Sequence, residues 1–508
     1  MQIIQLVKGR STMVLDDTYD VGEIIRESEF SREAPKVVTW HSPDGTVITM
    51  PIPNTVYPPR EDTELLAEAI FQRATTVEKR FFEVGVGSGV VTALAAQNGW
   101  IVSGCDINPL AVSCCKGILT ELGLQYESIF EGGPDDDSEE WYGQGSYDLL
   151  VWNLPYLAPA SLQQPHLGPL EEAGLCDLDD SANGLLKSLQ KNPEILAPNG
   201  SILLVTNDGK HNRILRSKWL CEGWSSRIIN QSRQKDGEIL RIIEFWRPWE
   251  KSIFEVVDKI GSTNSHMLEI GGAEGDGIRA IEQFSGRGQR NRNWVSQAGD
   301  FTASWIIHEC TLDDVSFNSG LIQLKSACAV ADACAAMAEI PLPGESDFGI
   351  NEFAECGLTI KWPNDIWLKG GKLAGILVES RSIGDRIRIV IGIGINRLKR
   401  KGNGGLIEAI STLEDLGIAH YSIVKIEAVI AASLASHFQS DKIASHHTEI
   451  EVCETVLKST LIHAETYGQP NLNGVQVTIK SLNAKGELIV ELPDGTPRTI
   501  DSTDTLQW

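Results

Sequence analysis

The stretch KWPNDIWLKGGKLAGILVE, residues 361–379, places two lysines around a Trp-Pro-Asn-Asp turn in an otherwise acidic chain. Lys361 precedes the turn, and Lys372 follows it at the start of a predicted strand, LAGILVE. Asn364 and Asp365 project oxygens that suit a hydrated magnesium ion beside a nucleotide phosphate. A fixed lysine beside an acyl phosphate stabilises the charge that develops as the phosphorus is attacked. The stretch therefore predicts a site that handles a phosphoryl group.

The composition of the whole chain limits the classes of protein that this site can belong to. The 508 residues predict about three domains, and the formal net charge of −25 argues against an extended nucleic-acid surface. The ten cysteines form no CxxC pair and no zinc-finger spacing with histidine, so we expect reduced thiols. The sequence shows neither a signal peptide nor a run of about 18 apolar residues for a membrane span. We expect a cytoplasmic protein without a membrane partner.

A first block, residues 1–248, has the pattern of an α/β domain with a parallel sheet. FFEVGVGSGVVTALAAQNGWIVSGCD, from Phe81, predicts a strand, a glycine turn, a helix and a second strand ending at Asp106. YDLLVW, GSILLVTND and EILRIIEFW are further predicted strands of the same sheet. The polar joint RPWEKS, which begins at Arg247, marks the end of this domain.

The remaining sequence predicts a second α/β domain at residues 252–466 and a small domain at 467–508. Short strands accompany an Ala-rich helix from Ser326 and a further helix from about Tyr421. From about Gly468, alternating strands are joined by NAKG and PDG turns, a pattern typical of a small antiparallel barrel.

Three further motifs of the second block accompany the KWPND stretch: GSTN at 261–264, GRGQRNR at 286–292 and GIGIN at 392–396. Gly286 and Gly288 allow a loop to wrap closely around a ligand, and the three arginines that follow Gly286 suit phosphates. In this order the motifs resemble those of the biotin protein ligase family, over residues 252–508. The resemblance implies an α/β catalytic domain and an SH3-like terminal barrel.

The same resemblance implies a two-step reaction. Biotin and ATP give biotinyl-5′-adenylate, and a lysine on a biotin carboxyl carrier domain of an acyl-CoA carboxylase then accepts the acyl group. The residues implied for biotin are Ser262, Thr263, Asn264, Gln283, Gly286, Arg287, Lys372 and Gly375. Those implied for ATP are Arg290, Arg292, Trp294, Lys361, Asn364 and Asn396, with Asp365 for magnesium. Lys372 and Arg287 are the expected catalytic residues. Gln289 departs from the best-known bacterial ligase, which has an arginine there.

The first block carries a glycine motif that fits two cofactors equally well on its own residues. In EVGVGSG, Asp106 follows Gly85 by the distance at which an acid reaches a ribose hydroxyl, as in sites for NAD or S-adenosylmethionine. NLPY, from Asn153 to Tyr156, directly follows the strand YDLLVW and favours the methyl donor. The Asn153 oxygen and the Leu154 carbonyl can accept both hydrogens of a planar NH₂ group, so that its nitrogen faces the methyl group.

With VYPPREDTELL at residues 56–66, this block resembles the HemK-type glutamine N5-methyltransferases, class I enzymes that modify the Gly-Gly-Gln loop of peptide-chain release factors. The resemblance implies a Rossmann-like fold and, in some relatives, a small activating subunit. It implies S-adenosylmethionine contacts at Glu83, Gly85, Gly87, Gly89, Asp106, Ile107 and Asn153, and catalytic roles for Asn153, Pro155 and Tyr156. Two alternatives stay open: a methyltransferase for amino groups of nucleic-acid bases, and a silent scaffold that only binds the cofactor. The net acidity weighs against nucleic acid.

Overall fold

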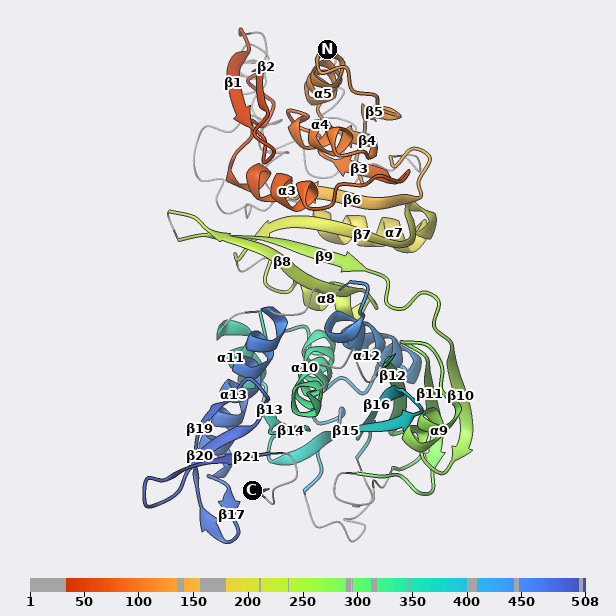
Figure 1. Cartoon of the computed structure of the whole chain (residues 1–508), viewed down its shortest axis with the longest axis vertical. Helices are drawn as coiled ribbons and strands as arrows, with labels where there is room; N and C mark the ends of the chain where they lie inside the picture. The colour runs from red at the N-terminus through yellow and green to blue at the C-terminus, as the bar shows by residue number, and fades with distance from the viewer. Residues whose placement is uncertain are drawn as a thin grey trace. The chain divides into compact units, whose positions relative to one another are not determined.

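The computed structural model describes most of the chain, which divides into two compact units. The described residues are 33–134, 141–155, 180–209, 212–235, 237–288, 294, 296–311, 318–345, 347–399, 409–442, 447–501 and 506–508. The first unit comprises residues 1–213 and 227–246, and the second comprises residues 214–226 and 247–508 (Figure 1).

The first unit is built around a seven-stranded sheet in the order β5-β4-β3-β6-β7-β9-β8. Strands β3 to β7 run parallel, and β9 is antiparallel to β7. The strands predicted at FFEV, LLVW, SILLV and RIIEFW are present, and their apolar residues are buried, as expected for strands covered on both faces. The strands are β3 (Arg80–Val84), β4 (Ile101–Asp106), β5 (Ser128–Glu131), β6 (Tyr147–Asn153), β7 (Leu196–Asn207), β8 (Ser225–Arg233) and β9 (Ile239–Trp246).

Helices connect these strands, and a hairpin precedes them. The helix α4 follows β3 at a left-handed glycine, Gly89, whose added Cβ would lie 2.6 Å from the Cα of Cys115. This close approach lets α4 and α5 pack on the same side of the sheet as part of one core. The helices are α3 (Glu61–Phe71), α4 (Val90–Gln97), α5 (Pro109–Glu121), α7 (Ser181–Lys191) and the 3-10 turn η2 (Pro193–Ile195); the hairpin is β1 (Lys36–His41) and β2 (Val47–Ile52).

The second unit contains a mixed seven-stranded sheet in the order β10-β11-β12-β16-β15-β14-β13. The pair β10 and β11 is parallel, and the other neighbouring strands are antiparallel. The strands are β10 (Phe254–Ile260), β11 (Gly277–Gln283), β12 (Phe301–Thr311), β13 (Leu358–Lys361), β14 (Asp365–Leu368), β15 (Gly371–Ile383) and β16 (Arg386–Ile395).

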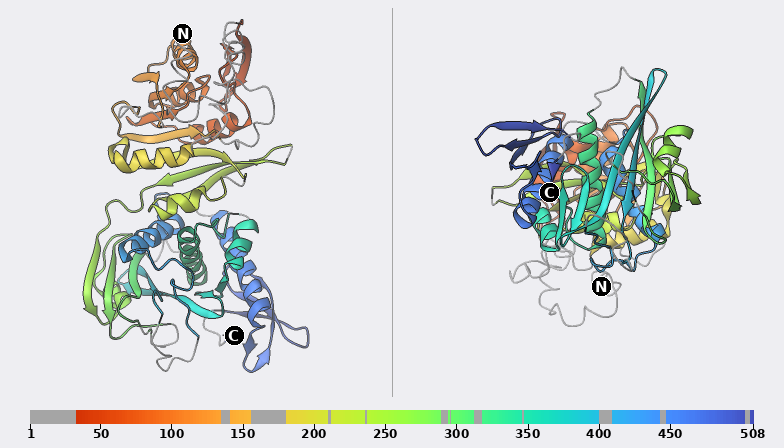
Figure 2. Two further views of the ribbon diagram at one scale, coloured as in Figure 1. Left: turned by 180° about the vertical axis from the view of Figure 1, so that it is seen from behind. Right: turned by 90° about the horizontal axis from the view of Figure 1, so that it is seen from below.

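Strand alternation gives the two faces of this sheet different partners. The odd-numbered isoleucines of β16, from Ile389 to Ile395, join the core that contains α10 and α12, whereas Val390 packs with Met267 and Leu268 of α9. The even-numbered positions 392 and 394 on the α9 side are glycines, so this face has room for something besides side chains of its own strand. The helices are α9 (Thr263–Ile270), α10 (Ser319–Met337), α11 (Asp347–Glu355), α12 (Ile423–Phe438) and α13 (His447–Tyr467), shown from two further sides in Figure 2.

The helix α10 begins at Ser319, seven positions before the predicted start at Ser326, because the Asn318 side chain caps it by accepting from the backbone N–H groups of Gly320 and Leu321. Among the described residues α10 alone is long and apolar enough to cross a membrane, but 83% of that window is buried inside the structure. The helix is therefore the core helix of the second unit.

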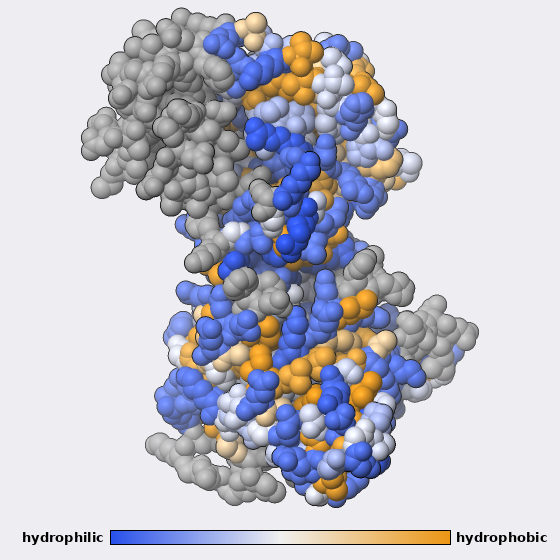
Figure 3. Space-filling view, turned by 90° about the vertical axis from the view of Figure 1, so that its left-hand side faces the viewer, coloured by the Kyte–Doolittle hydropathy of each residue, from blue (hydrophilic) through white to orange (hydrophobic). Residues whose placement is uncertain are grey.

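On the face shown in Figure 3, apolar residues lie in small groups among hydrophilic ones.

The C-terminal residues form two three-stranded antiparallel sheets, β18-β17-β22 and β19-β20-β21. Their buried residues Ile479, Leu488, Val490 and Ile500 belong to the same hydrophobic core as the rest of the second unit. The segment predicted as a separate domain at 467–508 thus lies within the second unit by its contacts. The strands are β17 (Asn471–Leu472), β18 (Val475–Gln476), β19 (Thr478–Leu482), β20 (Leu488–Glu491), β21 (Pro497–Ile500) and β22 (Leu506–Gln507).

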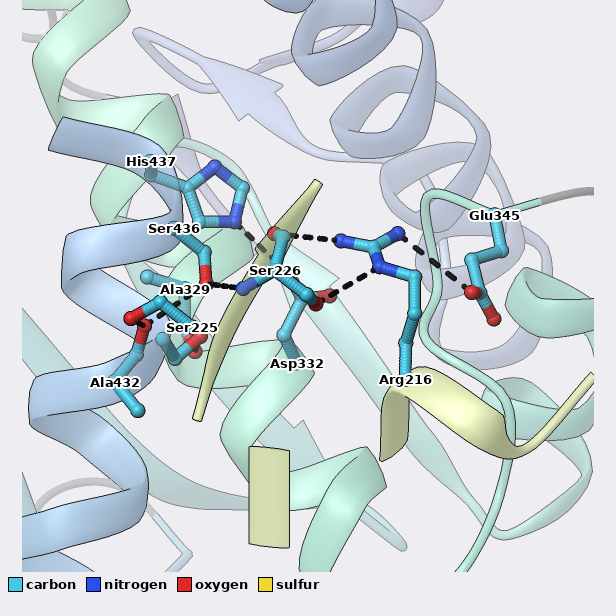
Figure 4. Close-up of polar contacts among 10 residues, drawn as sticks. Arg216, Ser225, Ser226, Ala329, Asp332, Glu345, Ala432, Ser436 and His437 are labelled. Carbon is cyan, nitrogen blue, oxygen red and sulfur yellow. Dashed lines mark hydrogen bonds and ion pairs between the residues drawn. The ribbon is translucent and has the colours of Figure 1, made fainter. Parts of the chain in front are cut away.

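The segment 214–226, with helix α8 (Leu215–Cys221), lies between β7 and most of β8 in the sequence but packs in the second unit. Arg216 donates to the Ser226 carbonyl oxygen at 3.2 Å and lies 3.6 Å from Glu345, and the Ser226 N–H donates to Ser436 Oγ at 3.0 Å (Figure 4). Ser225 Oγ donates to the Ala432 carbonyl at 2.8 Å. The predicted boundary near residue 250 did not separate this segment from the domain at 1–248, because its partners lie more than a hundred residues away in sequence.

Candidate functional site

The candidate site of the second unit lies on the α9 face of its sheet, where two glycines on neighbouring strands pair. Gly375 of β15 and Gly394 of β16 are register partners. The indole of Trp294 lies over both: a Cβ added at Gly394 would overlap ring atoms Cε2 and Cζ2, and one at Gly375 would lie 3.0 Å from Cζ3. The Trp294 N–H donates to the Gly286 carbonyl at 2.9 Å, which holds the start of the glycine loop against the same region. The two glycines therefore make a floor on which the flat ring rests.

Two lysines converge on one carboxylate beside this floor. Lys372 Nζ lies 2.7 Å from Asp365 Oδ1 and 5.9 Å from the centroid of the Trp294 ring. Lys361 Nζ lies 3.7 Å from Asp365 Oδ2 and 4.6 Å from the centroid of Trp367. The Lys361 and Asp365 side chains are only 11% exposed, so their charges are poorly screened by water. Two ammonium groups and one carboxylate leave a net positive charge, which suits an anionic ligand.

The backbone of Lys372 is fixed by three hydrogen bonds. Its N–H donates to the Ala409 carbonyl at 2.9 Å, and its own carbonyl accepts from the Ser411 N–H at 3.1 Å and from Asn396 Nδ2 at 2.9 Å. Asn364 Nδ2 likewise donates to the Ile376 carbonyl at 2.7 Å. In the structure, the two asparagines predicted to bind ATP hold the backbone of β15, and their role toward a nucleotide stays a prediction.

The sequence predicted a magnesium ion at Asp365. Both of its carboxylate oxygens face lysine ammonium groups. In the part of the chain that the structure describes, no group of three or more His, Cys, Asp and Glu side chains could hold a metal ion. The residues present fit a direct metal ligand poorly, because two ammonium groups next to Asp365 would repel a cation there.

The residues predicted to bind biotin come together at the start of α9. Ser262 caps this helix, and the Thr263 N–H donates to Gln283 Oε1 at 2.8 Å. Ser304 Oγ lies 2.7 Å from Thr263 Oγ1 and 2.6 Å from Asn264 Oδ1, and its single proton can serve one of them at a time. All of these residues except Gln283 are less than a tenth exposed. A buried set of hydroxyl and amide groups can recognise a small polar ring by hydrogen bonds.

Arg287 of the glycine loop is tied to the same cluster. Its guanidinium lies 3.0 Å from Glu379 Oε1, and Glu379 Oε2 also accepts from Asn264 Nδ2 at 2.9 Å. Glu379 therefore links the loop to the start of α9. Gln289, Arg290 and Arg292 lie outside the described residues.

A second candidate site lies in the first unit, at the carboxyl ends of β3 and β4. Gly85 and Gly87 both have positive φ, at 71° and 50°, which an L side chain rarely adopts. The Gly87 N–H donates to Asp106 Oδ2 at 2.9 Å and the Asn108 N–H to Asp106 Oδ1 at 2.8 Å. Burial raises the pKa of Asp106 to about 6 despite these bonds. The carboxyl ends of parallel strands are where such folds bind nucleotides, so the residues present fit a ribose held by Asp106.

Glu83 and Ile107 flank this loop. Glu83 is 4% exposed and accepts a hydrogen bond from Thr92 Oγ1, and burial raises the pKa of its carboxyl to about 8. Ile107 lies beside Gly133, where an added Cβ would come within 3.2 Å of Ile107 Cγ2. The structure thus brings together the residues predicted for the methyl donor around the ends of β3 and β4.

Asn153 ends β6 and lies beside a buried carboxylate from the start of α3. Asn153 Nδ2 donates to Asp62 Oδ2 at 3.0 Å, while Asn153 Oδ1 is buried and has no hydrogen-bond partner among the described residues. The Leu154 N–H donates to the Val205 carbonyl at 3.2 Å. Pro155 is described, and Tyr156 lies outside the described residues. A buried amide oxygen with no partner is costly unless a ligand hydrogen occupies it.

Comparisons with known proteins bear on the second unit. Residues 257–396 match the model of the Biotin/lipoate A/B protein ligase family. The matched residues lie within the second unit, and we refer to this part of the chain as the ligase domain, after the family that it resembles. The chain is 35% identical over 138 residues to the biotin-(acetyl-CoA-carboxylase) ligase of Paracoccus denitrificans, covering 27% of this chain and 50% of that protein. It is 35% identical over 148 residues to the same-named ligase of Mycobacterium tuberculosis, covering 28% and 48%.

A solved structure of the biotin protein ligase from Aquifex aeolicus, in complex with biotin and ATP, aligns with 51% of this chain and 99% of that chain at 20% identity and a TM-score of 0.40. The chain spans about half the length of the curated relatives it matches. The family model does not extend into the first unit.

Sequence reasoning missed three residues that the sites depend on. Glu379 and Ser304 organise the polar cluster of the ligase domain, and Asp62 holds Asn153 in the first unit. Glu379 and Asp62 both belong to quoted motifs, GKLAGILVE and VYPPREDTELL. The available signals were a charged residue at the end of an apolar strand pattern and an acidic residue in the first turn of a helix. Ser304 had no local signal, because its role depends on the pairing of β12 with β16.

Proposed function

We propose that the ligase domain is a biotin protein ligase, which activates biotin with ATP and transfers it to a lysine of a biotin carboxyl carrier domain in an acyl-CoA carboxylase. The observation that carries this proposal is the position of Lys372. Its ammonium lies between the Trp294 ring and Asp365, next to the glycine floor and within the segment that matches the ligase family. The relatives in Paracoccus and Mycobacterium, whose names give acetyl-CoA carboxylase, support the choice of partner.

In the first step, a carboxylate oxygen of biotin attacks the α-phosphorus of ATP. The bond between this phosphorus and the bridging oxygen breaks, and pyrophosphate leaves with the electron pair. Negative charge concentrates on the phosphoryl oxygens as this happens. Lys372 is placed to stabilise that charge, while Asp365 keeps its flexible side chain in one position by the 2.7 Å ion pair. Lys361, held over Trp367, adds a second cation behind it.

In the second step, the neutral ε-amine of the carrier lysine attacks the acyl carbonyl of the adenylate. The bond to the phosphate oxygen breaks, AMP leaves, and the new amide nitrogen loses a proton to solvent. The polar cluster at Thr263, Asn264 and Ser304 would hold the ureido ring of biotin during both steps, because its buried hydroxyl and amide groups match the donors and acceptors of that ring.

The test is Lys372→Ala, assayed by biotin-dependent exchange between ATP and pyrophosphate. Exchange should fall by about 100-fold or more, as is typical for loss of a positioned charge at a reacting phosphoryl group. Lys480→Ala is the matched control, because Lys480 also pairs with a carboxylate, Glu491, at 2.9 Å, but both side chains are more than two-fifths exposed. Near-normal exchange in Lys372→Ala would overturn the assignment.

We also propose that the first unit is an S-adenosylmethionine-dependent methyltransferase whose acceptor is the Gly-Gly-Gln glutamine of a peptide-chain release factor. One specific observation favours it: the buried, unpartnered Oδ1 of Asn153 at the end of β6. Such an oxygen can accept one N–H of a planar amide, and the Leu154 carbonyl can accept the other. The antiparallel β9 inserted between β7 and β8, and the glycine turn after β3, are compatible with a class I methyltransferase.

Asn153→Ala tests this second proposal. It should abolish methylation of a Gly-Gly-Gln peptide, followed by mass spectrometry, while calorimetry shows that the methyl donor still binds. Label appearing on DNA or RNA instead would favour the nucleic-acid alternative. Donor binding by the wild-type chain without transfer to a release factor, DNA or RNA would favour the silent scaffold.

A further inference from the structure

Asp62 is a buried carboxylate, 2% exposed, at the second position of α3. Both of its oxygens accept hydrogen bonds. Oδ1 accepts from the Thr63 N–H at 2.6 Å and from Thr63 Oγ1 at 3.2 Å. Oδ2 accepts from the Tyr57 hydroxyl at 2.9 Å and from Asn153 Nδ2 at 3.0 Å. The helix start and the tyrosine thus fix the carboxylate in place, and the carboxylate in turn meets the side-chain nitrogen of Asn153.

The orientation of the Asn153 amide decides what this residue can do. An asparagine side chain has a donor end and an acceptor end of nearly the same shape, so it can rotate by half a turn unless a neighbour distinguishes them. A carboxylate can only accept, and Asp62 therefore selects the orientation with Nδ2 toward itself. The opposite end, Oδ1, is left buried and without a partner among the described residues. Without Asp62, an N–H group could take the place of Oδ1.

Resting on the proposed methyltransferase function, we infer that Asp62 is a positioning residue that presents the Asn153 oxygen to the NH₂ group of the methyl acceptor. Its negative charge also polarises the Asn153 amide, because a hydrogen bond donated by Nδ2 to a carboxylate increases the electron density on Oδ1. Asp62 thus fixes the direction of Asn153 Oδ1 and makes this oxygen a stronger hydrogen-bond acceptor. The inference holds for any planar amine acceptor, whether a glutamine amide or the amino group of a base.

The chemistry explains why such a device matters at this position. During transfer the acceptor nitrogen forms a bond to the methyl carbon, and the bond from that carbon to sulfur breaks with its electron pair remaining on sulfur. Positive charge builds on the nitrogen, which afterwards releases one proton to solvent. An oxygen that accepts an N–H bond stabilises this charge more in the transition state than in the ground state, and an N–H donor in its place would repel it.

The test is a double-mutant cycle in the full chain. Asp62→Asn keeps the size of the side chain and an acceptor for Thr63, but its amide no longer distinguishes the two ends of Asn153. We expect kcat to fall by about 10- to 100-fold, the loss typical of misplaced reacting groups, with donor affinity by calorimetry unchanged within about threefold. Asp148→Asn is the matched control: it makes the same change at a carboxylate near the opposite end of β6, which accepts from the Arg80 N–H at 2.9 Å, so kcat should stay within about threefold of wild type.

The cycle is completed in the Asn153→Ala background, measured by its residual transfer or, where that vanishes, in Asn153→Ser. If Asp62 acts through Asn153, Asp62→Asn should have little further effect there, whereas a general loss of structure would add in both backgrounds. Unchanged kcat in Asp62→Asn, or additive losses, would overturn the inference while leaving the methyltransferase itself standing. Failure of the wild-type chain to methylate any planar amine would overturn both.

Discussion

Replacing Gly394 by alanine should move the Trp294 ring off the floor of the ligase site. The added Cβ would overlap Trp294 Cε2 and Cζ2, its nearest neighbours, and would lie 2.7 Å from Nε1; ordinary contacts begin at 3.4 Å, so the ring must shift by more than 0.7 Å. The strand cannot yield instead, because β16 is paired on both sides, with β12 and β15. A displacement approaching 1 Å in a reacting assembly typically costs about 100-fold in rate. We expect biotin-dependent exchange between ATP and pyrophosphate to fall by about this factor.

Two alanine substitutions grade the effect. Gly375→Ala brings its Cβ to 3.0 Å from both the Trp294 ring and Lys372 Cε, a smaller overlap that should give a smaller loss. Gly344→Ala, whose nearest neighbour is Thr455 Oγ1 at 3.4 Å, should be near neutral. If the damage acts through the indole, Gly394→Ala should cost far less in a Trp294→Phe background, where the ring is smaller. Exchange within about threefold of wild type in Gly394→Ala alone would refute the placement of Trp294 over the site.

Three further predictions follow from contacts within each unit. Glu379→Gln removes the charge partner of Arg287, so biotinyl-5′-adenylate should escape into solution about three- to tenfold faster. The factor follows because charge-assisted bonds to arginine contribute roughly 1 kcal/mol more than neutral ones. Chromatography of the released adenylate without acceptor measures the escape rate, and an unchanged rate would contradict the prediction. Trp219→Ala in α8 should destabilise the second unit by about 3–5 kcal/mol, the usual cost of truncating a buried tryptophan. The melting temperature should fall, and biotin and ATP should partly restore it. An unchanged melting curve would count against this prediction. The methyl donor should bind about tenfold more weakly at pH 5 than at pH 7. A ribose hydroxyl binds the ionised form of Asp106, whose pKa burial raises to about 6, so protonation below that pH removes the acceptor. Calorimetry on Asp106→Asn should show weak binding that no longer varies between pH 5 and pH 7.

The sequence indicated the sheets wherever glycine turns punctuate runs of buried apolar residues. The pattern from Phe81 to Asp106 predicted β3, α4 and β4, because both faces of these strands are covered and their residues are apolar throughout. Strand β8 was not predicted, since SSRIINQSR is largely polar and only half-buried. Helix α13 was also missed: its sequence mixes β-branched and acidic residues, and its packing on β13 rather than local propensity stabilises it.

The candidate sites divide in the same way. Motifs with glycine and lysine at short spacing predicted the neighbourhood of Lys372 and of Asp106, because the residues involved come from one turn or from adjacent strands. Their partners were not predictable, since Glu379 meets Asn264 and Asp62 meets Asn153 only through contacts between segments about ninety or more residues apart. The role of a buried carboxylate is recognised from the groups that donate hydrogen bonds to it, and these groups are known only when the fold is known.

The segment 214–226 shows how a division of the chain by local composition can fail. Its neighbours in sequence belong to the first unit, and the joint at Arg247 is polar and contains proline, as a domain boundary should. Yet Leu220 lies in the hydrophobic core of the second unit, Ser225 Oγ donates to a carbonyl of α12, and Ser217 Oγ donates to the Ile340 carbonyl beyond α10. A chain beginning at the joint would leave the surfaces of α10 and α12 without this helix, exposing apolar groups and unpaired polar ones. The second unit therefore includes residues that precede its own motifs and lie beyond the boundary that local composition marks.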